Sequence, residues 1–138
     1  MAYWLMKSEP GAWSWAQQVA KGGKGEAWSG VRNHQAKLNL MKMKKGDRAF
    51  FYHSGADKAA VGIVEVIREH YPDPTAKPDE PWVMVDVMAI APLAKPVTLD
   101  AIKAEPKLKG MALVNNTRLS VQPVTADEWK LVCKMGGL

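Results

Sequence analysis

Short segments in which hydrophobic and polar positions alternate recur along the chain, and a period of about two residues is typical of half-buried β-strands. Residues 61–67 are rich in Val and Ile, which favour strands. Residues 82–90 alternate regularly, with Val83, Val85 and Val87 on one side. The pattern predicts strands over residues 3–7, 49–53, 61–67, 82–90 and 119–124, with an irregular, proline-rich loop over 71–81.

Helix start signals lie between these segments. Ser14, Thr98 and Thr125 each have a side chain suited to an N-cap, and Glu128 completes the spacing of a capping box with Thr125. We therefore expect helices from Ser14 through residue 20, over about 33–43, over 99–104, and over 126–135, the last ended by Gly136.

Two details of this pattern are specific enough to test. In the helix over residues 33–43, Leu38 and Met41 are three residues apart and would face inward, whereas the lysines would stay in solvent. The glycine-rich stretch over residues 22–25 is expected to be a flexible basic link.

The order of the predicted elements indicates the fold class. Strands outnumber the short helices, and the hairpin-like spacing over residues 47–90 favours a mostly antiparallel sheet. We expect this sheet to curl into a small β-barrel with short flanking helices, which is an α+β fold. At 138 residues the chain has room for one core, so residues 1–138 are predicted to form a single domain.

Composition narrows the class of protein further. About half of the residues are hydrophobic, as in ordinary folded domains, and no apolar run approaches the roughly 20 residues that a membrane-spanning helix needs. The first ten residues lack the features of a secretory signal. The single cysteine, Cys133, is expected to be a core thiol in a reducing compartment. The sequence therefore predicts a cytoplasmic monomer with no membrane segment.

Positive charge is concentrated in the first part of the chain. Residues 1–58 contain ten of the 19 Lys and Arg residues but only four acidic residues, whereas the remainder is near neutral. Such a basic region can attract a polyanion, because release of counterions drives binding to phosphates. It can equally be a solubilising surface, and charge alone leaves both interpretations open.

Known catalytic and metal-binding patterns do not occur in the sequence. His34, His53 and His70 lie far apart and match no metal-ligand spacing. Neither a nucleophile elbow nor a phosphate loop is found, and the glycines over 22–25 lack the spacing of one. We therefore expect a binding protein without metal or cofactor, and not an enzyme.

Among the six tryptophans, Trp28 occupies the most unusual setting. Trp4 and Trp129 lie on a predicted strand and helix and are expected in the core. Trp28 instead lies in an irregular stretch beside Ser29, Arg32 and Asn33, where an indole can stack on a flat heterocycle while polar neighbours read its edge. A tryptophan that plugs the end of the barrel would give the same pattern. Arg32 can bind phosphate or pack on the barrel, and Asn33 can cap the following helix or bond a base edge.

Several blocks of sequence, in order along almost the whole chain, resemble the EVE domain family. The sequence is similar to a stand-alone bacterial-type member. The blocks are residues 3–10 (YWLMKSEP), 28–36 (WSGVRNHQA), 43–47 (MKKGD), 50–54 (FFYHS), 62–66 (GIVEV), 71–73 (YPD), 81–87 (PWVMVDV) and 118–124 (RLSVQPV).

This resemblance implies a PUA-like barrel, related to YTH and ASCH domains, whose pocket accepts a modified base flipped out of its strand. Family members are implicated in binding modified cytosines in DNA. His34 stands where the family commonly has an aromatic residue such as Tyr, which leaves its contact with a ligand open. Carried onto this chain, the base-binding pocket comprises Lys7, Ser8, Trp28, Asn33, His53, Ser54, Leu119 and Ser120. Candidate phosphate-binding residues are Arg32, Lys37 and Lys44.

Three functions are therefore compared. The leading hypothesis is a nucleic-acid-binding module that takes a flipped modified base, a modified cytosine in DNA, into an aromatic pocket. The second is a module that reads a modified RNA base, since the barrel relatives include RNA readers and the pocket physics is the same. The third is a small base-processing hydrolase that uses His53 or Lys7.

Overall fold

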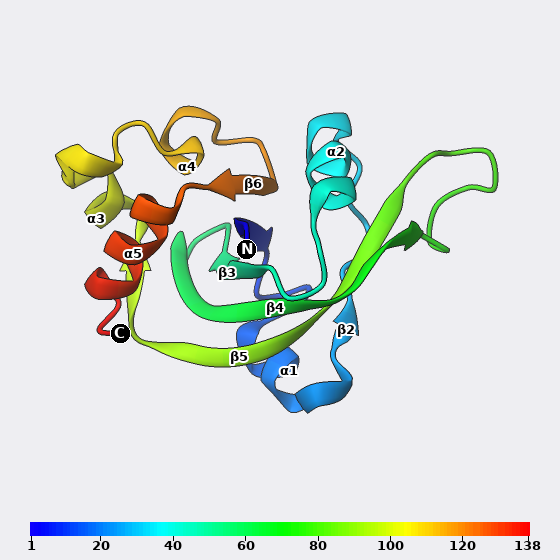
Figure 1. The fold of residues 1–138 in the computed structure, drawn as a ribbon, viewed down its shortest axis with the longest axis horizontal. Coiled ribbons are helices and arrows are strands. Elements are labelled where there is room, and N and C mark those ends of the chain that lie inside the picture. The colour runs from blue at the N-terminus through cyan, green and yellow to red at the C-terminus, as the bar shows by residue number, and fades with distance from the viewer.

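The computed structural model describes all of residues 1–138, which fold around one six-stranded sheet (Figure 1). Its strand order is β2-β5-β4-β3-β1-β6, with β1 and β3 parallel and every other pair antiparallel. The strands are β1 (Tyr3–Ser8), β2 (Glu26–Ala27), β3 (Arg48–His53), β4 (Ala59–Pro72), β5 (Val83–Thr98) and β6 (Val121–Val124). The helices are α1 (Trp15–Ala20), α2 (His34–Lys42), α3 (Leu99–Ala104), α4 (Ala112–Asn115) and α5 (Ala126–Met135), with 3₁₀ turns η1 (Gly22–Lys24) and η2 (Pro106–Leu108).

The long strands β4 and β5 bend together and curve the sheet around its interior (Figure 1). Shifts in the register of this pair mark bulges, which increase bending and twist. The sheet stays open between its edge strands β2 and β6, and α2 packs against both β5 and β6. The Asn39 amide in α2 donates a hydrogen bond to the Val121 carbonyl of β6, 2.7 Å away. The predicted α+β class is confirmed. The sheet curves as expected but does not close into a barrel, and α2 packs across the opening between its edge strands.

The sheet is buried on both faces. Side chains from one face of the strands, including Trp4 and Phe51, form one core cluster with α2. Side chains from the opposite face, including Leu5 and Phe50, form a second cluster with α3, α4 and α5. Successive residues of β1 and β3 therefore enter different cores, as strand geometry requires. The predicted burial of Trp4 and of Trp129 is confirmed.

Local capping signals located the helices well. Ser14 and Thr125 each form a capping box, with Gln17 and Glu128 respectively, and Thr98 accepts a hydrogen bond from the Ala101 N–H. Helices α3 and α5 have the predicted bounds. The strands β4 and β5 are longer than predicted, because bulges let them continue through irregular sequence. The short elements β2, η2 and α4 were not predicted.

Two detailed predictions are wrong. Leu38 and Met41 are 46% and 40% exposed, and the inward face of α2 carries Ala36, Asn39 and Leu40 instead. The polar Asn39, which bonds to β6, interrupts the apolar spacing and conceals the true inward face. The stretch over residues 22–25 is not a flexible link but the turn η1, and Gly25 (φ +69°) lies so close to β5 that a Cβ atom would be 2.5 Å from the Val87 carbonyl oxygen.

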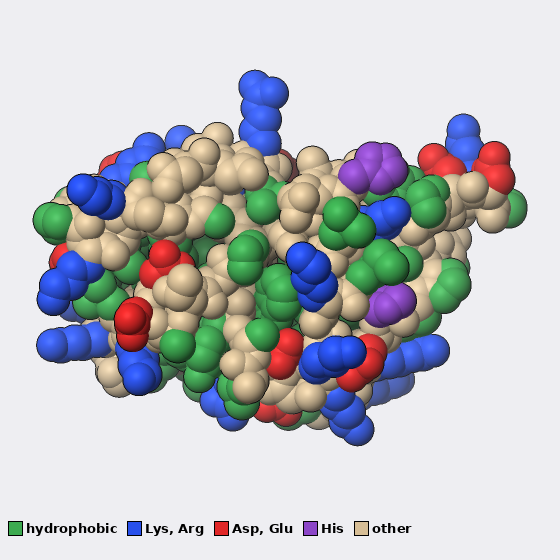
Figure 2. Space-filling view, turned by 45° about the horizontal axis from the view of Figure 1, so that its top comes forward, with side chains coloured by type: hydrophobic (Ala, Val, Ile, Leu, Met, Phe, Trp, Pro, Cys, Tyr) green, Lys and Arg blue, Asp and Glu red, His purple; other side chains and the backbone are tan.

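Charge is spread over the surface. Figure 2 shows Lys and Arg side chains all around the visible face, with acidic side chains among them. The basic part of the sequence, residues 1–58, supplies the central strands β1 and β3 as well as the helices α1 and α2. No three His, Cys, Asp or Glu side chains are grouped as a metal site would require. None of the helices has both the length and the apolar character to cross a bilayer.

Candidate functional site

A cavity of about 320 Å³ opens where the end of β1, the turn before α1 and the segment after β2 meet. We call it the aromatic hollow. Its volume is at the lower end of the range of about 300–1,000 Å³ that is usual for small-molecule sites. The lining comprises the two indoles of Trp13 and Trp28, the charged residues Lys7 and Glu26, the hydroxyls of Ser8 and Ser29, and two alanines, Ala12 and Ala27.

Trp28 is a rigid wall of the aromatic hollow. Its backbone N–H donates to the Val85 carbonyl at 2.7 Å, which extends the short pairing of β2 with β5 by one residue. The indole meets the Phe51 ring edge to face, with centroids 5.4 Å apart, and is only 8% exposed. Most of the ring is therefore held by core packing, while the part that borders the hollow stays available to a ligand.

Trp13, which sequence reasoning missed, lines the same hollow. Its indole N–H donates to the Gln18 side chain at 2.9 Å, and Gln18 is fully buried and donates to the Val87 carbonyl at 3.2 Å. Ser8 Oγ donates to the Trp13 carbonyl at 2.6 Å. These bonds fix the turn that presents Trp13. The available signal was its position directly before the N-cap Ser14, outside any predicted element.

Glu26 is the second residue that sequence reasoning missed. It begins the two-residue strand β2, which has no periodic pattern to reveal it, and β2 pairs with β5 opposite Val87. One carboxylate oxygen accepts from the Ala27 N–H at 3.2 Å, and the other lies 3.7 Å from Lys21 Nζ. The hollow therefore contains a hydrogen-bond acceptor of full negative charge beside its two indoles.

Lys7 also lines the hollow, at the end of β1. Its ammonium donates to the Thr117 carbonyl at 2.7 Å, and its backbone N–H donates to the Ser120 carbonyl at 2.9 Å. Burial lowers the pKa of Lys7 below its usual value, because partial removal from water disfavours the charged form. An anion that binds beside this ammonium would reverse that effect.

The structure brings some predicted pocket residues together and leaves others apart. Lys7, Ser8 and Trp28 line the aromatic hollow. Leu119 is buried in the same core cluster as Trp28, and Ser120 is joined to Lys7 through the backbone, but neither lines the hollow. Their contact with a base stays a prediction.

Asn33, His53 and Ser54 also lie outside the aromatic hollow. Asn33 caps α2 by accepting from the Ala36 N–H at 2.9 Å. His53 Nε2 accepts from the Trp15 N–H at 3.0 Å, so its other nitrogen carries the proton and donates to Asp57 at 3.2 Å. Ser54 lines a neighbouring cavity.

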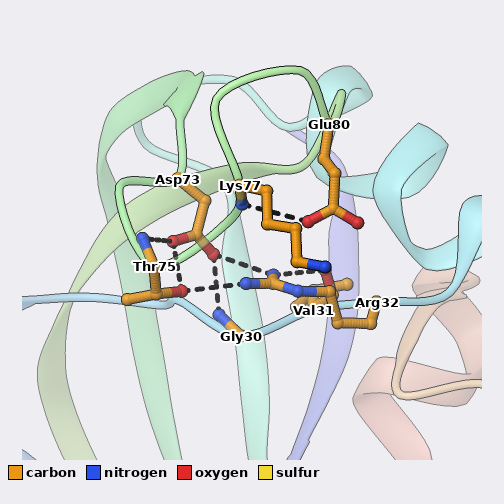
Figure 3. Close-up of polar contacts among 7 residues, drawn as sticks. All are labelled: Gly30, Val31, Arg32, Asp73, Thr75, Lys77 and Glu80. Atoms are coloured by element: carbon orange, nitrogen blue, oxygen red, sulfur yellow. Dashed lines mark hydrogen bonds and ion pairs between the residues drawn. The ribbon is translucent and has the colours of Figure 1, made fainter.

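Arg32 is tied to the loop after β4 (Figure 3). Its guanidinium lies 3.1 Å from Asp73 and donates to Thr75 Oγ1 at 2.9 Å, while Asp73 also accepts from the Gly30 N–H at 2.8 Å. Both terminal nitrogens of Arg32 thus have partners, which leaves less of it for phosphate. The other two candidates for phosphate binding are Lys37 on α2 and Lys44 after it, and neither ammonium group is engaged in an ion pair. The backbone N–H of Lys44 donates to Asp47 at 3.0 Å.

Asp73 is held as a charged group by this arrangement. Desolvation alone would raise its pKa, but hydrogen bonds from the Thr75 side chain, the Gly30 and Thr75 backbone N–H groups and Arg32 outweigh that effect. The net result is a pKa of about 2. The segment that carries Trp28 is thereby anchored to the loop after β4.

Comparison with known proteins identifies the family. The EVE domain model matches residues 2–135. Thymocyte nuclear protein 1 of Mus musculus is 34% identical to this chain over an alignment of 164 positions. The alignment covers 96% of this chain and 73% of that protein.

Among solved structures, a Rhodopseudomonas palustris protein is 65% identical with a TM-score of 0.93, covering 99% of this chain and 94% of that one. The human THYN1 protein, crystallised in complex with 5-methylcytosine containing DNA, is 32% identical with a TM-score of 0.90, covering 100% of this chain and 99% of that one. The YTH domain of Zygosaccharomyces rouxii MRB1, at 19% identity, 99% and 87% coverage and a TM-score of 0.60, shares the fold. This chain belongs to the EVE domain family.

Proposed function

We propose that this protein binds nucleic acid and accommodates a flipped modified base, a modified cytosine in DNA, in the aromatic hollow. The observation that carries the proposal is the presence of two indoles, Trp13 and Trp28, in one cavity of about 320 Å³. Stacking on an aromatic side chain contributes about 1–3 kcal/mol per base, and flipping a base out of a duplex costs a few kcal/mol. Binding of an isolated domain is therefore expected to be modest.

The polar lining of the hollow supports cytosine as the base. A carboxylate accepts a hydrogen bond from the exocyclic amino group of cytosine, and Glu26 supplies one. Ser8 already donates its proton to the Trp13 carbonyl, so its oxygen is left to accept from a ligand. Thymine presents a carbonyl in place of that amino group and would face these acceptors unfavourably.

The choice of DNA is supported by the human THYN1 complex with 5-methylcytosine containing DNA, because that protein aligns with all of this chain. Lys37 and Lys44 remain the predicted contacts for phosphates outside the hollow. RNA is the competing ligand, and a preference for RNA that depends on the 2′-hydroxyl would decide for it.

Fluorescence anisotropy at fixed salt tests the proposal. Wild-type protein is titrated with duplexes that differ only in whether one cytosine carries a 5-methyl group, and with the matching RNA. We expect tighter binding to the methylated DNA, and loss of that preference in Trp28→Ala. Equal affinity of the folded wild type for both duplexes would overturn the proposal whatever the variant does.

We further propose binding without chemical conversion of the base. Prolonged incubation of the protein with the methylated oligonucleotide, followed by mass analysis, should return the oligonucleotide unchanged. A product of altered mass that is absent with heat-denatured protein would favour the hydrolase instead.

A further inference from the structure

A second cavity, of about 290 Å³, lies beside the aromatic hollow and contains three lysines. We call it the lysine hollow. Lys7, Lys58 and Lys103 come from β1, the turn before β4 and the last turn of α3, so tertiary folding alone brings them together. Tyr52, Ser54 and Thr117, which each carry a hydroxyl group, also line it. Three cations and three hydroxyls around one cavity are a set of donors suited to an oxyanion.

Lys7 is shared by the two hollows. Its ammonium donates to the Thr117 carbonyl at 2.7 Å and lies 5.9 Å from the centroid of the Tyr52 ring. Thr117 and Tyr52 belong only to the lysine hollow, so the charge of Lys7 lies there. A single nucleotide could therefore contact both cavities across this residue.

Lys58 has an unusual backbone. It has a φ of 45°, the only positive value among the non-glycine residues, in the left-handed region that ordinary side chains rarely adopt. Its carbonyl accepts from the Leu99 N–H at 2.8 Å, which attaches this turn to the start of α3, the helix that carries Lys103. Conformations of this kind occur often at ligand sites, and here one holds a lysine at the cavity.

The carboxylates near the lysine hollow leave its cations largely uncompensated. No acidic residue lines it. Asp57 is bonded to His53 at 3.2 Å. Asp100, in the first turn of α3, acts on Tyr52, whose pKa is raised by burial first and by the charge of Asp100 second. Lys7, Lys58 and Lys103 form no ion pair with either carboxylate, so their charge is available to a ligand.

We propose that the lysine hollow binds a phosphate group of the nucleic acid whose base enters the aromatic hollow. The identity of the ligand rests on the proposed function, whereas the preference for a phosphate rests on the lysines themselves. The proposal adds Lys7, Lys58 and Lys103 to the phosphate contacts expected from the sequence. Of those expected contacts, Arg32 is already engaged with Asp73.

The salt dependence of binding tests this proposal. The double variant Lys58→Gln/Lys103→Gln removes two charges but keeps a polar group at each position, and Lys7 is left intact because it also lines the aromatic hollow. The matched control is Lys95→Gln/Lys109→Gln, which removes the same charge from two exposed lysines outside both hollows. Each lost phosphate contact lowers the slope of log K against log salt by about 0.9 for duplex DNA.

We expect the slope to fall by about 0.9 in Lys58→Gln/Lys103→Gln, because the contact with one phosphate is lost, and to change little in the control. The ratio of affinities for methylated and unmethylated duplex should stay as in wild type. An unchanged slope in Lys58→Gln/Lys103→Gln, or an equal fall in both double variants, would overturn the phosphate site. The proposed binding of a modified base in the aromatic hollow would not be affected. If the wild type bound methylated and unmethylated duplexes equally well, only the proposed function would be overturned.

A second measurement uses inorganic phosphate as the probe and needs no nucleic acid. Amide NMR shifts of Ser54, Gly55 and Lys58 should change in a saturable way in the wild type and in the control variant. The same shifts should be lost in Lys58→Gln/Lys103→Gln. Shifts that persist in that variant, or none in the wild type, would count against a phosphate site in this cavity.

Discussion

Arg32 and Asp73 join two segments that lie 41 residues apart in the sequence, with 3.1 Å between guanidinium nitrogen and carboxylate oxygen. The same oxygen of Asp73 accepts from the Gly30 N–H, two residues after Trp28. The Asp73 side chain is fully buried, so it has exchanged water for these partners. This pair therefore determines how firmly the segment that carries one wall of the aromatic hollow is held.

Acid should weaken the fold through Asp73. Because its folded-state pKa is lowered from 3.8 to about 2, the group stabilises the protein fully above about pH 4, and this contribution disappears as the pH falls through 2. The shift corresponds to about 2 kcal/mol. Asp73→Asn should lose about that much stability at pH 7 and show a flatter acid dependence in urea unfolding, whereas Asp79→Asn, on the same loop and exposed, should match wild type.

Removal of Trp13 should weaken binding more than removal of an indole that lies outside the hollow. Trp13→Ala deletes one aromatic wall, and affinity for a methylated oligonucleotide should fall by roughly 5- to 150-fold, which corresponds to ~1–3 kcal/mol of stacking. Trp82→Ala is the matched control, because that indole is also half-buried but packs against His34 and outside the hollow. Equal losses of affinity in the two variants would show that Trp13 has no direct contact with the base.

Glu26 should distinguish an amino group from a carbonyl on the base. 5-Methylcytosine and thymine carry the same methyl group and differ on the base-pairing edge. 5-Methylcytosine has an amino group at position 4 and no proton on N3, whereas thymine has a carbonyl and an N3–H, so single strands that contain one or the other compare the two edges directly. Wild type should prefer 5-methylcytosine by roughly tenfold, within the ~1–3 kcal/mol of a good base-edge contact. Glu26→Gln should lose most of this preference, whereas Asp79→Asn, which removes the same charge elsewhere, should keep it.

Gly62 should not tolerate a side chain. A Cβ atom at this position of β4 would lie 2.5 Å from the Trp15 ring, which cannot move aside like a flexible chain. Gly62→Ala should therefore cost about 1–3 kcal/mol of stability, as overpacking does. Gly23→Ala meets no atom within 4 Å and has no positive φ, so its unfolding midpoint in urea should remain close to wild type.

Most of the helices could be predicted because their signals are local. The boxes at Ser14 and Thr125 each consist of two residues three positions apart, and this contact forms wherever the helix forms. The inward face of α2 could not be predicted in this way. Asn39 is buried there because the Val121 carbonyl, 82 residues further along the chain, accepts from its side chain.

The candidate site shows the same division. Trp28 stood out because its neighbours are polar and irregular, and Lys7 and Ser8 because they end a strand in a recognisable block. The sequence around Trp13 and Glu26 does not indicate that they line a site, since Trp13 precedes a helix cap and Glu26 begins a strand of two residues. Only the pairing of β2 with β5 and the bond from Ser8 to Trp13 place them in one cavity.

By itself the sequence determined the α+β class, the capped helices and the central indole at position 28, because these depend on periodicity, on residue types and on contacts within one turn. The family followed from blocks of sequence that resemble it along almost the whole chain. The tertiary structure alone decided that the sheet stays open under α2, that Arg32 is engaged with Asp73, and that Lys7 joins an aromatic cavity to a cationic one. The physical reason is that a curved sheet brings together residues from distant segments, and no local pattern records which of them will meet.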